Sequence, residues 1–159
     1  MRRWLPGLLV ALLLLGGCNP ANRSQGWAET AVSQNWQAKY RLVFHQKDAD
    51  LEMLVRESRG ETLVLDIQMS RGALRLEYDG DVLLVDLDEG DLEWQDVPRQ
   101  VPYYTLSEIA RLFAAAPELT LQGEGVEHQG YRLKVKKGLP LEAELAPEWS
   151  LYVEEFIWH

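Results

Sequence analysis

The chain has 159 residues, of which 47% are hydrophobic and 26% charged, and its 16 basic and 25 acidic side chains give a formal net charge of −9. This length suits one globular domain, and the composition excludes global disorder. The acidic balance argues against a nucleic-acid-binding protein. The single cysteine excludes a disulfide framework within the chain and a multi-cysteine metal site.

The N-terminal segment has the layout of a secretory signal. Two arginines follow Met1, an apolar run extends over residues 4–15, and two glycines precede Cys18. The apolar run is shorter than the roughly 20 residues that a membrane-spanning helix needs. Residues 15–18 (LGGC) resemble a bacterial lipobox, in which the cysteine becomes the lipidated first residue. The alternative is an ordinary signal with a chance cysteine, but we expect residues 1–17 to be a lipoprotein signal peptide and Cys18 to carry lipid.

The residues after Cys18 indicate where the anchored chain resides. Asn19 follows the cysteine, and in enteric-type lipoproteins the absence of aspartate there favours the periplasmic face of the outer membrane. Residues 18–26 are polar and contain Pro20 and Gly26, so we expect a lipidated cysteine followed by a flexible tether. The folded domain is then expected over residues 27–159, beginning with a short helix at 27–35.

From Trp36 onward the residues alternate between apolar and polar, a period of two that predicts strands with one apolar face. Turn sequences separate these runs, and Asp79-Gly80 is a strong hairpin signal because both positions tolerate a positive φ. The predicted strands of this first meander cover residues 36–45, 51–56, 63–69, 73–78, 82–87 and 91–95.

The period then changes to that of a helix. Thr105 and Glu108 form a capping box, an apolar stripe follows, and Pro117 ends the helix. Strands are predicted again at residues 119–122, 130–136, 141–145 and 151–158. The whole chain therefore predicts a mainly β fold with nine or ten strands in one curved antiparallel sheet and one or two helices.

No constellation in the sequence indicates catalysis. None of the histidines, His45, His128 and His159, lies near a serine or cysteine in a recognisable nucleophile motif. Glu154 and Glu155 are adjacent on a strand and should face opposite ways. The acidic segment of residues 86–91 fails to match a calcium loop, because its glycine is one position early and the closing glutamate is missing. We expect no enzyme activity, no metal site and no cofactor; an unrecognised hydrolase using His45 or His128 is the remaining enzymatic alternative.

Three stretches carry a resemblance to a known family. They are residues 63–85 (LVLDIQMSRGALRLEYDGDVLLV), 101–117 (VPYYTLSEIARLFAAAP) and 138–158 (GLPLEAELAPEWSLYVEEFIW). Together with the lipobox and a tryptophan-led first strand, they resemble the LolA/LolB lipoprotein-carrier superfamily, and its LolB branch most closely. The similarity covers most of residues 36–158, by pattern rather than by a strict motif.

The resemblance implies an unclosed half-barrel with a helical lid. Its apolar hollow takes the acyl chains of a lipoprotein or lipid cargo, which a periplasmic LolA-like carrier donates and a LolB-like protein helps to localise to the outer membrane as a chaperone. It also implies several acyl chains, palmitate among them, on Cys18, and more than one chain makes anchoring effectively permanent.

The sequence also predicts which side chains line such a hollow, because a curved sheet must cover its apolar face with helices or with a ligand and only one clear helix is available. The expected lining residues are Tyr40, Leu42, Phe44, Met53, Leu63, Leu65, Ile67, Leu74, Leu76, Leu83 and Val85 from the strands and Leu106, Ile109 and Phe113 from the lid. The same residues fit a close-packed core, and an anchored interaction module with a filled core and a partner on its acidic outer face is the alternative function.

One stretch departs from the family pattern. LolB has an exposed apolar residue in a proline-leucine-glycine loop that helps insertion into the membrane, and the matching stretch here is residues 68–72 (QMSRG). Met69 is the apolar residue that substitutes for it.

Overall fold

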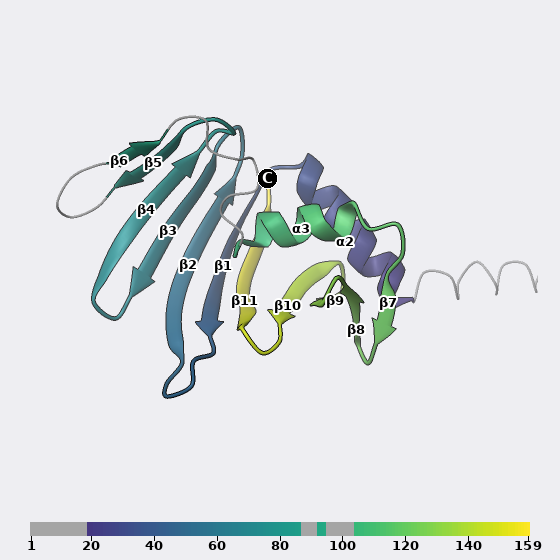
Figure 1. Ribbon diagram of the computed structural model, residues 1–159. Helices are drawn as coiled ribbons and strands as arrows, with labels where there is room; N and C mark the ends of the chain where they lie inside the picture. The colour runs from purple at the N-terminus through teal and green to yellow at the C-terminus, as the bar shows by residue number, and fades with distance from the viewer. Residues whose placement is uncertain (1–18, 87–91, 95–103) are drawn as a thin grey trace, which may run out of the picture.

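The computed structural model describes residues 19–86, 92–94 and 104–159 (Figure 1). Two helices fall in this part of the chain, α2 (Pro20–Ser33) and α3 (Leu106–Ala114). The strands are β1 (Trp36–Phe44), β2 (Leu51–Arg59), β3 (Leu63–Met69), β4 (Gly72–Tyr78), β5 (Leu83–Asp86), β6 (Leu92–Trp94), β7 (Thr120–Gln122), β8 (Gly125–His128), β9 (Tyr131–Lys136), β10 (Leu139–Leu145) and β11 (Trp149–Trp158).

The described strands form one antiparallel sheet in the order β6-β5-β4-β3-β2-β1-β11-β10-β9-β8-β7. Its edges, β6 and β7, are not paired with each other, so the sheet is not closed into a barrel. Each neighbour in this order is also the neighbour in sequence, except that the last long strand returns to pair with the first. The predicted mainly β class, the antiparallel sheet and the two helices are therefore confirmed.

Strand register places the apolar residues that were predicted to face inward on one face of the sheet. Across the centre, Leu42 is paired with Met53 on β2 and with Leu151 on β11. The helices lie on this same face, over the β7–β11 half of the sheet, while β2–β6 extend beyond them (Figure 1). α2 packs against β7–β10 and against α3. One half of the apolar face is thus covered by helices of the same chain.

The N-terminal helix is longer than the sequence patterns predict. α2 begins at Pro20, with the Asn19 side chain accepting a hydrogen bond from the backbone N–H of Ala21 at 3.0 Å. Proline at the first helical position and asparagine at the cap are ordinary start signals. Most of the segment expected as a tether is therefore helical, and Trp27, Ala28 and Ala31 bury one side of it.

The second helix begins as predicted. The Thr105 hydroxyl accepts a hydrogen bond from the backbone N–H of Glu108 at 3.1 Å, which satisfies one of the free donors of the first turn. Leu106, Ile109 and Phe113 form its fully buried stripe. The amphipathic pattern thus directs this helix onto the sheet.

Two local features differ from the predictions. Residues 125–128, expected as loop and turn, form strand β8, where a side chain at Gly125 would lie 2.8 Å from the Leu133 carbonyl oxygen. A register shift opposite Lys39 and Tyr40 inserts Glu154 into β11 as a bulge. Glu154 therefore bonds Lys39 on the outer face at 2.8 Å, and Glu155 lies beside Lys39 on the same face, contrary to the expected alternation.

Candidate functional site

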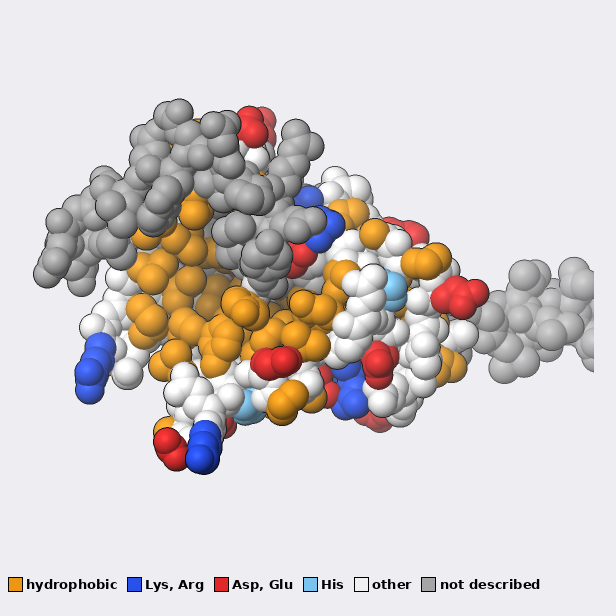
Figure 2. Space-filling model, viewed as in Figure 1, with side chains coloured by type: hydrophobic (Ala, Val, Ile, Leu, Met, Phe, Trp, Pro, Cys, Tyr) orange, Lys and Arg blue, Asp and Glu red, His pale blue; other side chains and the backbone are white. Residues whose placement is uncertain are grey.

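The part of the apolar face on which neither described helix packs is the candidate site. Strand register aligns Val55, Ile67 and Leu74 in one row across β2–β4, and Leu65, Leu76 and Val85 in the next row across β3–β5. Of these side chains, Ile67, Leu74 and Leu76 are half-buried, whereas Val55, Leu65 and Val85 are buried. Figure 2 shows a broad, hollowed apolar surface in this region. We call the half-buried inward residues of β2–β5 the open face: Met53, Leu63, Ile67, Leu74, Leu76 and Leu83.

The other predicted lining residues lie mostly in the packed core. Buried side chains among them are Tyr40, Leu42, Leu65, Val85, Leu106, Ile109 and Phe113. The half-buried Phe44 lies between the two groups. The structure therefore places all the predicted strand residues on one face but divides them into a buried group and the half-buried open face.

A buried carboxylate joins the two halves, and sequence analysis did not single it out. Glu57 lies on the inward side of β2, is fully buried, and accepts hydrogen bonds from the Tyr40 hydroxyl at 2.8 Å and from the backbone N–H groups of Leu106 and Ser107 at 2.9 Å each. It thereby caps α3 from the sheet. Burial raises the pKa of Glu57, and burial together with the Glu57 charge raises the pKa of Tyr40. In the sequence, the one signal for this role was that Glu57 lies two residues after Val55, at an inward position of the strand alternation.

An aromatic cluster borders the open face at the end where β1 turns into β2. Phe44 is paired with Trp149 on one side and with Leu51, 39% exposed, on the other. The Tyr104 ring makes edge contacts with Phe44 and Trp149, at centroid distances of 5.0 and 5.9 Å, and Tyr131 lies 6.0 Å from Trp149. We call Phe44, Tyr104, Tyr131 and Trp149 the aromatic cluster.

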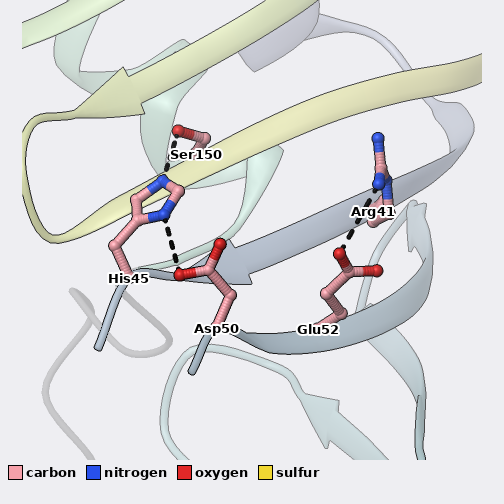
Figure 3. Close-up of polar contacts among 5 residues, drawn as sticks. All are labelled: Arg41, His45, Asp50, Glu52 and Ser150. Carbon is pink, nitrogen blue, oxygen red and sulfur yellow. Dashed lines mark hydrogen bonds and ion pairs between the residues drawn. The ribbon is translucent and has the colours of Figure 1, made fainter. Parts of the chain in front are cut away.

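A histidine, an aspartate and a serine meet on the opposite, outer face (Figure 3). His45 Nε2 lies 2.9 Å from Ser150 Oγ, and His45 Nδ1 lies 3.3 Å from Asp50 Oδ1. Sequence analysis had found no serine near this histidine. Ser150 is 5% exposed and paired on both sides, to Val43 and Glu144, in the middle of the sheet. A nucleophilic serine needs an exposed turn with free N–H donors beside it, so this geometry supports a link between the β1–β2 loop and β11.

The outer face also carries a shallow groove of about 540 Å³. Charged and polar groups alternate along it, and Arg75 bonds Asp66 and Glu77 at 2.9 Å each. The lining residues are Leu54, Arg56, Asp66, Ile67, Gln68, Ala73, Leu74, Arg75 and Asp86. Two residues of the open face, Ile67 and Leu74, also line this groove.

Other predicted features fall at the limits of the described chain. Met69 is the half-buried last residue of β3, paired with Gly72. Cys18, the signal peptide and most of the acidic segment after Asp86 lie outside the described residues. Within the described ranges, no group of His, Cys, Asp or Glu side chains has metal-binding geometry, and neither helix has the length and apolarity to span a bilayer.

The sequence was compared with known proteins. No protein-family model matches it, and a search of curated proteins finds no significant match.

Proposed function

We propose that this protein is a membrane-anchored, non-enzymatic carrier or receptor for acylated cargo, whose acyl chains bind on the open face. The observation that supports it best is an unclosed sheet whose apolar face continues over β2–β5, beyond the part on which the two described helices pack. Leaving such a surface in water is unfavourable by about 25 cal/mol per Å², and hydrocarbon chains are ligands that match it without polar partners.

In this proposal the sheet acts as a half-barrel of the LolA/LolB kind, with α3 as part of a lid. α3 is fixed to the sheet at its N-terminus by Glu57 and packs against α2. The site therefore has a rigid, helix-covered wall and an apolar floor on β2–β5. Extended chains that lie along this floor contact Met53, Ile67 and Leu74.

In this proposal the lipobox-like residues 15–18 support attachment of the carrier to a membrane. Lipid on Cys18 anchors the chain to the outer membrane at its periplasmic face, where lipoprotein or lipid cargo is delivered by a LolA-like donor. Met69 is the residue proposed to contact the membrane. Because it is half-buried at the end of β3 rather than raised on a loop, we propose capture of cargo as the primary role.

A pair of matched substitutions tests the open face. Leu76→Glu places a carboxylate on the apolar floor, whereas Leu84→Glu places it on the outer side of the neighbouring strand, where Leu84 is already 41% exposed. We expect a fluorescent fatty-acyl probe to bind the soluble domain at one site, with affinity reduced more than about 10-fold by Leu76→Glu, because burying a charge costs several kcal/mol. Leu84→Glu should change it less than about twofold. Equal effects of the two variants, or no binding to the wild type, would contradict the proposal.

The outer groove favours a second function, that of an anchored interaction module. Its paired arginine and acidic residues offer a polar surface for a protein partner. In that case Arg75→Glu should release a co-purifying partner, and Leu76→Glu should not.

A further inference from the structure

Trp149 has a buried hydrogen-bond donor that the fold does not use. The residue is 1% exposed, and its indole Nε1–H has no acceptor among the described residues. An unpaired buried donor costs about 1–3 kcal/mol, so buried polar groups are nearly always bonded. Trp36 shows the contrast, because its Nε1 donates to the Ala31 carbonyl at 2.9 Å.

The position of this donor relates it to the open face. Trp149, Phe44 and Leu51 form one row across β11, β1 and β2, so the indole lies about two strand spacings, roughly 10 Å, from the edge of the open face. The surface between them is apolar and partly exposed, since Phe44 and Met53 are both half-buried. A hydrocarbon chain on the open face therefore ends, at this side, beside the aromatic cluster.

The cluster also contains one exposed ring. Tyr104 covers Trp149 by an edge contact at 5.9 Å, yet 47% of Tyr104 is exposed. Its displacement costs little buried surface compared with that of Trp149 or Phe44. Tyr104 is therefore the ring of the cluster that a ligand would displace at the lowest cost in buried surface.

We infer that the indole N–H of Trp149 binds the carbonyl oxygen at the head of an acyl chain, while the hydrocarbon lies on the open face. This rests on the proposed function and extends it from apolar ligands in general to ester- or amide-linked acyl chains. A carbonyl oxygen is an acceptor only, as an indole donor requires. The neighbouring aromatic rings exclude water, which strengthens the bond.

Two probes of equal chain length test the inference: a pyrene-labelled dodecane and the methyl ester of pyrene-labelled dodecanoic acid. Trp149→Phe keeps an aromatic ring and removes the donor. We expect wild-type protein to prefer the ester, and Trp149→Phe to lower that preference by about 3- to 10-fold, the effect of one hydrogen bond. Trp27→Phe is the matched control, because Trp27 Nε1 is also buried without a partner but lies on the helix-covered side, against Phe156.

A measurement on the wild type does not depend on the variants folding. In ¹⁵N-tryptophan-labelled protein, the Trp149 indole proton should move downfield with the ester and not with the hydrocarbon. An unchanged indole resonance, or an ester preference that Trp149→Phe retains or that Trp27→Phe lowers equally, overturns the inference. If both probes bind the wild type equally, only the inference fails, whereas if neither binds, the proposed function fails with it.

Two further ligands distinguish whether the carbonyl belongs to lipoprotein cargo or to membrane lipid. A diacylglyceryl-cysteine peptide represents lipoprotein cargo, and phosphatidylethanolamine with the same chains represents membrane lipid. If Trp149→Phe weakens the binding of one of these two ligands, that ligand identifies the source of the carbonyl. If the variant weakens neither, the inference is contradicted.

Discussion

Replacing Glu57 with glutamine tests how the lid helix is held. The carboxylate accepts one hydrogen bond from Tyr40 and two from the first turn of α3. Glutamine keeps one acceptor oxygen and places an NH₂ group against the remaining donors, so at least one of the three bonds is lost. With a buried donor left unpaired, we expect Glu57→Gln to lower the free energy of unfolding by about 1–3 kcal/mol at pH 4.5.

The pH dependence of this difference has a definite sign. Because burial raises the pKa of Glu57, the folded chain retains this proton over a pH range in which the unfolded chain has released it. The unfolding free energy of the wild type therefore falls as pH rises through that range, by at most about 1.4 kcal/mol per pH unit for one proton. Glu57→Gln lacks this titration, so the two proteins should become more alike from pH 4.5 upward.

Urea unfolding followed by tryptophan fluorescence at pH 4.5, 6.0 and 7.5 measures this difference. Glu155→Gln is the control, because Glu155 is exposed on the outer face, and its effect should stay within about 0.5 kcal/mol at each pH. A stability difference between wild type and Glu57→Gln that widens with rising pH would refute the reasoning. It would mean that the three donors outweigh burial and lower the pKa of the carboxyl.

Three further substitutions test the packing and the two faces. Leu65→Ala removes a fully buried side chain and should cost about 2–5 kcal/mol in urea unfolding; a cost below about 1 kcal/mol would show that the site is loosely packed. Gly125→Ala places a Cβ 2.8 Å from the Leu133 carbonyl oxygen and should lower the melting temperature, so an unchanged value would contradict the close approach of β8 and β9. His45→Ala should lower the melting temperature slightly and leave acyl-probe binding unchanged, since His45 lies on the outer face; lost binding would contradict that placement.

Period-two alternation predicts much of the sheet because most strands bury one face only. Trp36–Phe44 shows this, with a polar residue facing outward at nearly every second position. β8 escaped prediction because four residues with a glycine at the start give too short a pattern. α2 was partly missed because its first turns are polar, although Asn19 and Pro20 were a valid helix start.

The candidate site was predictable only in part. Alternation identifies which strand residues share a face, but the half of that face that remains open depends on where α2 packs, and α2 lies on β7–β10, far away in sequence. Hydrogen bonds between Glu57 and α3 span about fifty residues, and no local pattern encodes them. The Glu154 bulge likewise follows from pairing with β1 rather than from the residues of β11 alone.

Photolabelling with a fatty-acyl probe that carries a diazirine near the end of its chain tests most directly whether the open face is the binding site. Mass spectrometry of the labelled domain should find the adducts on β2–β5, at inward residues such as Met53, Leu76 and Leu83, and an excess of unlabelled acyl chain should suppress them. Adducts confined to the outer groove around Arg56 and Arg75, or labelling that competitor does not reduce, would contradict an acyl-binding role for this surface.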